Sequence, residues 1–136
     1  MKWELLLIDD EECILDSLAD LLTEEDIIVT KASNGLEGLS LLREKHFDVV
    51  ISDITMPKMD GISMLTAARA EGIFVPTIFF SALTNPLIMA EIKQSGATAV
   101  IPKPHFERLS AELNSVLTRH QFMFTPQMTL EAVQTV

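Results

Sequence analysis

The chain has 136 residues, a length typical of one domain that can build its own core without a disulfide or a metal. Ten basic against 20 acidic side chains give a formal net charge of −10, which argues against binding nucleic acid through its phosphates. Cys13 is the one cysteine, so no internal disulfide can form, and no apolar run approaches the ~18 residues that cross a bilayer. We therefore expect a cytoplasmic chain that neither spans a membrane nor is secreted.

Short apolar runs rich in strand-forming residues alternate with helical patterns along residues 3–118. Runs that are apolar almost throughout are typical of strands buried on both faces, as in a parallel sheet. The runs predict strands at Trp3–Ile8, Ile27–Lys31, Asp48–Ser52, Val75–Ser81 and Ala97–Ile101.

Apolar residues at helical spacing between and after these runs predict five helices. For the fourth helix, Asn85 is the expected N-cap, Pro86 the first helical residue and Gly96 the C-terminal stop. The stripes of the other helices comprise Ile14, Leu15, Leu18, Leu21 and Leu22; Leu36, Leu39 and Leu42; Ile62, Leu65 and Ala68; and Phe106, Leu109, Leu113, Val116 and Leu117.

Five strand–helix pairs in alternation predict a doubly wound α/β fold with a five-stranded parallel sheet and right-handed crossovers. Ligands of such sheets bind beyond the carboxyl ends of the strands, where the strand order reverses. The alternation ends at Arg119, so we assign residues 1–119 to the domain and residues 120–136 to a C-terminal tail or the start of a linker. Thr125 and Pro126 are compatible with one further short helix.

Polar side chains follow four of the five predicted strands: Asp9 and Asp10, Asp53, Ser81 and Lys103. Three carboxylates at one edge repel one another unless a cation intervenes, and Mg²⁺ is typically held by carboxylates, waters and phosphate oxygens. A lysine and a hydroxyl at the same edge are suited to bind phosphate. Each residue alone also has an ordinary explanation, as a helix start or a turn, but together they predict a phosphoryl-transfer site.

Four stretches of the chain have the order and spacing of one known family. The most specific is the run Asp-x-x-Met-Pro-x-Met-Asp-Gly that begins at Asp53. On these residues the chain resembles, over about residues 2–119, the response-regulator receiver domains of two-component signalling, which have a flavodoxin-like (βα)5 fold. The stretches are Leu6–Glu11, Asp53–Gly61, Pro76–Ala82 and Lys103-Pro104.

The resemblance implies a phosphorylation-controlled switch in a phosphorelay, with Mg²⁺ as cofactor. Asp53 would accept a phosphoryl group from the phosphohistidine of a sensor kinase or phosphotransfer protein. The surface around the fourth and fifth strands would then change and regulate a downstream protein or an attached effector domain. The implied Mg²⁺ ligands are Asp10, Asp53 and the backbone carbonyl of Thr55, with Asp9 acting largely through water, and the implied phosphoryl ligands are Ser81 and Lys103.

Three positions bear on how the output surface responds and on how fast the phosphoryl group is lost: Val100, Thr55 and Leu83. Val100 stands where the family usually has an aromatic ring whose rotation reports phosphorylation, so the output surface is expected to respond in another way or weakly. Thr55 and Leu83 flank the expected path of the hydrolytic water. Leu83 is apolar and cannot orient that water, which favours slow loss of the phosphoryl group.

Three other functions remain open from the sequence. A Mg²⁺-dependent phosphatase of the haloacid dehalogenase type needs a second aspartate two residues after its nucleophile, where this chain has Thr55. A flavodoxin-like cofactor binder needs a phosphate-cradling turn after the first strand, where this chain has the acidic run Asp9–Glu12. A receiver-like adaptor that is never phosphorylated is disfavoured by Ser81 and Lys103. We therefore expect a phosphoacceptor domain and not a turnover enzyme.

Overall fold

The structure, a computed structural model, describes residues 2–82 and 85–123, with side chains as far as Arg119. Leu83 and the helix considered at Thr125-Pro126 lie outside the described residues. The elements in chain order are β1 (Trp3–Ile8), α1 (Glu12–Leu22), β2 (Ile27–Ala32), α2 (Gly35–Glu44), β3 (Val49–Ser52), α3 (Gly61–Ala70), β4 (Thr77–Ser81), α4 (Pro86–Ser95), β5 (Ala99–Pro102) and α5 (Phe106–Met123).

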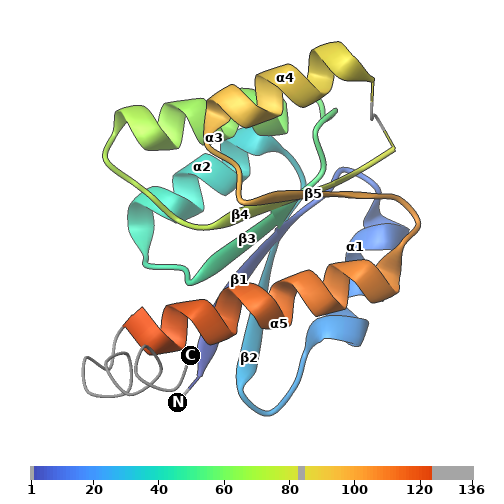
Figure 1. Cartoon of the computed structure of the whole chain (residues 1–136), viewed down its shortest axis with the longest axis vertical. Coiled ribbons are helices and arrows are strands. Elements are labelled where there is room, and N and C mark those ends of the chain that lie inside the picture. Colours follow the sequence, from blue (N-terminus) through green and yellow to red (C-terminus); the bar gives the residue numbers. More distant parts are fainter. Residues whose placement is uncertain (1, 83–84, 124–136) are drawn as a thin grey trace, which may run out of the picture.

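One parallel sheet forms the centre of the molecule, with its strands in the order β2-β1-β3-β4-β5. Helices cover the sheet on both faces (Figure 1). β2 lies on one side of β1, and β3 lies on its other side, followed by β4 and β5. The strand order therefore reverses between β1 and β3. The predicted doubly wound five-stranded sheet is confirmed.

The ends of four strands differ from the sequence prediction, those of β2 (Ile27–Ala32) and β3 (Val49–Ser52) by one residue each. β4 begins at Thr77, two residues after the predicted Val75, because Pro76 has no N–H to give to a ladder. β5 begins at Ala99 and runs through Pro102. A proline is tolerated there because β5 is an edge strand of the sheet.

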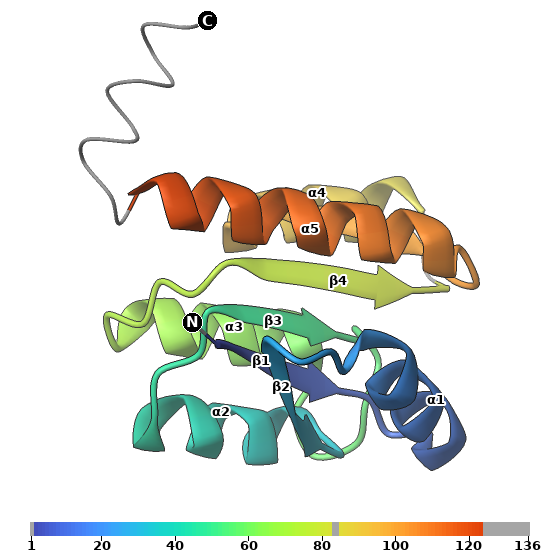
Figure 2. The same ribbon diagram turned by 90° about the horizontal axis from the view of Figure 1, so that it is seen from below.

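Two apolar layers separate the sheet from its helices. α1 and α5 pack on one face and α2 and α3 on the other, with α4 completing the second layer near β4 (Figure 1). Figure 2 shows β1, β3 and β4 running in the same direction between the helices. The predicted stripes are buried or half-buried with three exceptions: Leu21 is 52% exposed, Leu36 is 48% exposed and Phe106 is 38% exposed. Each helix contacts the sheet along an arc narrower than its apolar stripe, so the flanking members of the stripe face solvent.

Helix ends follow the predicted capping chemistry. Asn85 accepts a hydrogen bond from the N–H of Ile88 at 3.0 Å, Pro86 opens α4, and Gly96 closes it in the left-handed conformation at φ 85°. The last helix, α5, continues past Arg119 to Met123. In the part of the chain that the structure describes, no helix combines the length and apolar character needed to cross a membrane.

Candidate functional site

The carboxyl ends of the strands meet at one edge of the sheet. β1 and β3 are neighbours with Ile8 opposite Ser52, so the next residues, Asp9 and Asp53, leave the sheet side by side. The N–H of Asp53 donates to the carbonyl of Ile8 at 2.9 Å, which ties the two strand ends together. The structure brings together at this edge all five predicted side chains: Asp9, Asp10, Asp53, Ser81 and Lys103.

The three carboxylates form a compact group. Asp9, Asp10 and Asp53 each offer an oxygen, and these oxygens lie within 4.8 Å of one another. The side chain of Asp9 is 3% exposed and that of Asp53 is 12% exposed, whereas Asp10 faces solvent. Backbone N–H groups orient the two inner carboxylates: Glu11 donates to Asp9 at 2.9 Å and Ile54 donates to Asp53 at 2.7 Å.

Lys103 supplies the positive charge of the site. Its Nζ donates to Oδ2 of Asp9 at 2.9 Å and to Oδ2 of Asp53 at 3.0 Å. Burial by itself lowers the pKa of Lys103, but the hydrogen bonds to the two carboxylates outweigh burial and raise the pKa above its ordinary value. Lys103 is therefore held charged at neutral pH between the two inner carboxylates.

An open hollow of about 390 Å³ lies over this group. Ser81 is 1% exposed at the end of β4, and its carbonyl accepts the N–H of Lys103 at 2.9 Å. Thr55 is exposed at the rim. The hollow is lined by Asp10, Glu11, Asp53, Thr55, Ser81, Ala82 and Lys103. A small anion that enters it meets a cation, a hydroxyl and carboxylates on the same rim.

The donor set fits a hard divalent cation. The described residues hold one group of three metal-binding side chains, and all of its members are carboxylates, without histidine or cysteine. Oxygen donors of this kind suit Mg²⁺ better than a soft transition metal. Asp9, Asp10, Asp53 and the Thr55 carbonyl are the residues that would hold the ion, which would neutralise charge on transferred phosphoryl oxygens.

The loop after Asp53 packs closely against its own strand. The N–H of Gly61 donates to the carbonyl of Ile54 at 2.7 Å. A Cβ on Gly61 would collide with the carbonyl oxygen of Asp53 and approach the ring of Phe79 to 2.8 Å. The backbone of Lys58 adopts the left-handed conformation at φ 68°, which residues other than glycine rarely take. Glycine at position 61 is thus required for the path of the chain beneath the acceptor.

Two of the expected tuning residues, Val100 and Thr55, lie apart from one another. Val100 is half-buried on β5 and lines a separate hollow with Met89 and Ile92, next to α4. Thr55 is at the rim of the carboxylate group. Glu11 also lines that rim, although the sequence analysis gave it no role. The signal was present, because Glu11 continues the acidic run directly after Asp10.

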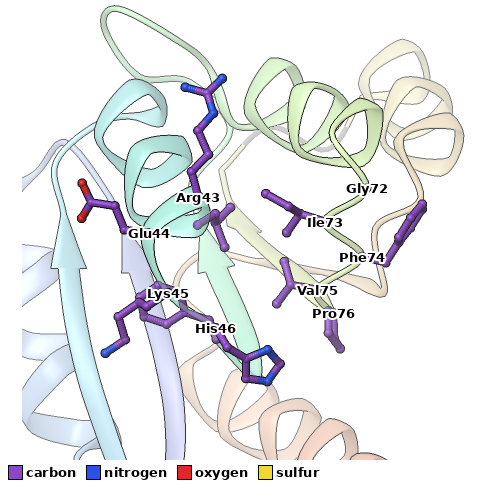
Figure 3. A pocket seen from close by; sticks show the side chains of 11 residues that line it. Arg43, Glu44, Lys45, His46, Gly72, Ile73, Phe74, Val75 and Pro76 are labelled. Carbon is purple, nitrogen blue, oxygen red and sulfur yellow. The ribbon is translucent and has the colours of Figure 1, made fainter.

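A third hollow, of about 460 Å³, lies at the opposite end of the sheet from the carboxylates, between the α2–β3 and α3–β4 connections (Figure 3). In that view Ile73 and Val75 line its wall, while Phe74 turns outward. Arg43 is paired with Glu71 there, at 2.6 Å between Nη2 and Oε2. The carboxylate group at the other edge is therefore the better candidate for chemistry.

A doubly wound parallel sheet with an acidic cluster and a half-buried lysine at the carboxyl ends of its strands defines a flavodoxin-like α/β domain. Residues 5–114 match the family model of the response regulator receiver domain, and the chain belongs to this family. It is a receiver domain of two-component response regulators. The resemblance found in the sequence is confirmed.

Solved receiver structures share the fold. The receiver domain of the Francisella response regulator 1452 is 31% identical, with a TM-score of 0.81, and the match covers 88% of this chain and 99% of that one. The chemotaxis response regulator CheY4 of Vibrio cholerae is also 31% identical, with a TM-score of 0.78 over 85% of this chain and 99% of that one.

Curated relatives are longer proteins. The probable C4-dicarboxylate response regulator DctR of Bacillus subtilis (strain 168) is 34% identical over 105 residues, which are 76% of this chain and 46% of that protein. A protein-glutamate methylesterase/protein-glutamine glutaminase of Nocardioides sp. is 41% identical over 103 residues, 73% of this chain and 28% of that protein. The chain thus spans less than half the length of both relatives.

Proposed function

We propose that Asp53 is the phosphoacceptor of this receiver domain. The observation that carries the proposal is the meeting of three carboxylates with Lys103 at the switch point of the sheet. Asp53 is the member that lies at the end of a central strand, contacts Lys103 and also borders the open hollow. Asp9 is more deeply buried and Asp10 has no such contact with Lys103, so neither combines these features.

The transfer follows from this arrangement. A carboxylate oxygen of Asp53 attacks the phosphorus of a phosphohistidine, a P–O bond forms, the P–N bond breaks, and the imidazole leaves and takes up a proton. Lys103 and the hydroxyl of Ser81 bind oxygens of the transferred group in the hollow. Positioning and electrostatic stabilisation carry reactions of this type, and Mg²⁺ at the carboxylates supplies part of the charge neutralisation.

The phosphoryl group adds about −1.5 to −2 charge at pH 7 beside β4 and β5. We expect the surface around these strands to change and to regulate a partner or an attached effector domain. The phosphodonor is a sensor kinase or a phosphotransfer protein in the cytoplasm. The unit that responds is residues 1–119, with residues 120–136 as a tail or linker. In this proposal the chain takes part in its own phosphorylation and is not a turnover enzyme.

A phosphatase of the haloacid dehalogenase type is disfavoured by Thr55. Such an enzyme needs a proton donor two residues after its nucleophile, and the threonine there has no carboxyl group. We expect instead that the chain becomes phosphorylated and does not hydrolyse an added phosphate ester.

Mass spectrometry after incubation with acetyl phosphate and Mg²⁺ tests the proposal. The unaltered chain is expected to gain one phosphoryl group, and Asp53→Asn to gain none. Asp60→Asn is the matched control, because Asp60 lies in the same loop and caps α3 by accepting from the N–H of Ser63 at 2.8 Å. Asparagine caps a helix as well as aspartate does. Phosphoryl incorporation that persists in Asp53→Asn places the acceptor elsewhere.

A further inference from the structure

The first residue of α2 touches the loop that follows the acceptor. The N–H of Gly35 has no partner within its own helix, and it donates to the carbonyl oxygen of Met59 at 3.0 Å. A Cβ on Gly35 would collide with that oxygen and would lie 2.9 Å from the carbonyl carbon of Met59. The group in the way is backbone, which cannot rotate aside as a side chain can. Glycine at this position is therefore what lets α2 begin against the loop.

This hydrogen bond joins the backbone of the loop to another helix. Loop residues 54–60 make their other backbone hydrogen bonds locally: Gly61 donates to Ile54, Met59 to Pro57 and Met64 to Asp60. Within the described residues, the bond from Gly35 is the one backbone hydrogen bond that joins this loop to an element outside β3 and α3. The start of α2 thus fixes one backbone carbonyl of the loop.

One turn later, Gly38 faces core side chains and not backbone. A Cβ there would lie 2.5 Å from Cδ1 of Ile8, the residue before Asp9, and 3.1 Å from the sulfur of Met64. Both neighbours are the far ends of flexible side chains, so this position can accommodate a methyl group by a small side-chain shift. Gly35 and Gly38 therefore differ in what a methyl group would displace, although both lie in the first turns of α2.

We propose that Gly35 is a positioning residue for the metal site. By fixing the carbonyl of Met59, it restrains the loop that carries Thr55, a residue that lines the same hollow as Asp53. The inference rests on the proposed function, because it assumes that the Thr55 carbonyl and the carboxylates bind Mg²⁺. If the contact favours metal binding, metal binding must strengthen the contact by the same free energy.

Calorimetric titration with Mg²⁺ tests the proposal in the full chain. Gly35→Ala is expected to raise the Kd for Mg²⁺ about tenfold, which is a common size of coupling between two sites. Gly38→Ala, the matched control, is expected to change the Kd less than twofold even if it lowers the thermal stability of the metal-free chain. Equal Kd values for Gly35→Ala and the unaltered chain overturn the role of Gly35 and leave the proposed function in place. No Mg²⁺ binding by the unaltered chain overturns both.

Amide hydrogen exchange gives a second test that needs no variant. Saturating Mg²⁺ is expected to slow exchange of the Gly35 N–H more than exchange of the Gly38 N–H, which bonds within the helix region to Asn34 at 3.0 Å. The Gly72 N–H at the opposite end of the sheet reports general stabilisation. Equal slowing of all three amides contradicts a specific link between Gly35 and the metal site.

Discussion

Lys103 forms an ion pair with Asp9, 94 positions earlier in the chain, at 2.9 Å between Nζ and Oδ2. The two residues follow β5 and β1, which are separated in the sheet by β3 and β4. The lysine side chain therefore reaches from the edge of the sheet to its centre. It neutralises a carboxylate that would otherwise be buried without a cation, a costly arrangement.

Removal of the Lys103 charge is expected to strengthen metal binding and weaken phosphorylation. In Lys103→Met the ammonium group no longer competes with Mg²⁺ for Asp9 and Asp53, so the Kd for Mg²⁺ should fall about fivefold, the equivalent of about 1 kcal/mol. The rate of phosphorylation by acetyl phosphate at saturating Mg²⁺ should drop, because the phosphoryl oxygens lose a cation. Lys58→Met is the control, since Lys58 is exposed in the neighbouring loop. Unchanged phosphorylation in Lys103→Met contradicts the assigned role.

Alkaline pH is expected to remove the stabilisation that Lys103 provides. Its pKa in the folded chain lies above the ordinary value of 10.5 because the hydrogen bonds to Asp9 and Asp53 outweigh burial. Its contribution is therefore complete below pH 10.5 and is lost as the pH rises through the folded value. Urea unfolding of the unaltered chain and of Lys103→Met, compared across this range, should show a difference that is constant below pH 10.5 and declines above it. A difference that grows with pH would mean that the pKa is lowered.

Gly61→Ala is expected to destabilise the fold and disturb the acceptor. The added methyl group collides with the backbone of Asp53 and the ring of Phe79, and overpacking of this kind costs about 1–3 kcal/mol. Phosphorylation should slow at the same time, because Asp53 is displaced. Gly72→Ala separates the two effects: Gly72 has φ 83° and open space around it, so alanine there costs about 1 kcal/mol of stability by backbone strain alone. Normal phosphorylation in Gly61→Ala would show that the loop accommodates the methyl group.

Arg69 holds two connections together at the end of the sheet remote from the carboxylates. Its guanidinium donates to the carbonyls of Ile73 and Val75, both at 2.9 Å, and to that of Gly96 at 3.4 Å. Lysine has a single ammonium nitrogen in place of the planar guanidinium whose N–H groups reach several carbonyls. Arg69→Lys should therefore lower the free energy of unfolding by about 2 kcal/mol. Phosphorylation of the folded variant should be unchanged. Equilibrium urea unfolding measures this loss. Arg43→Lys is the control: Arg43 forms an exposed ion pair with Glu71, so its substitution is expected to lower the free energy of unfolding by less than about 1 kcal/mol.

The sequence by itself determined the order of the elements and the edge of the sheet at which the candidate site lies. Apolar runs predict strands because buried strands need apolar side chains on both faces, and Asn85, Pro86 and Gly96 predict the ends of α4 through local backbone chemistry. Parallel connections then place the residues after β1, β3, β4 and β5 at one edge. These inferences need only neighbouring residues and the handedness of the chain.

The tertiary structure decided what depends on how the elements pack. The stripes could not show that Leu21 and Leu36 face solvent, because the width of the buried arc depends on the distance and tilt of each helix against the sheet. Nor could spacing show that Lys103 contacts both Asp9 and Asp53, or that Gly35 meets the carbonyl of Met59. Such contacts join residues far apart in the chain, and their geometry is set by the packing of whole layers, to which every core side chain contributes.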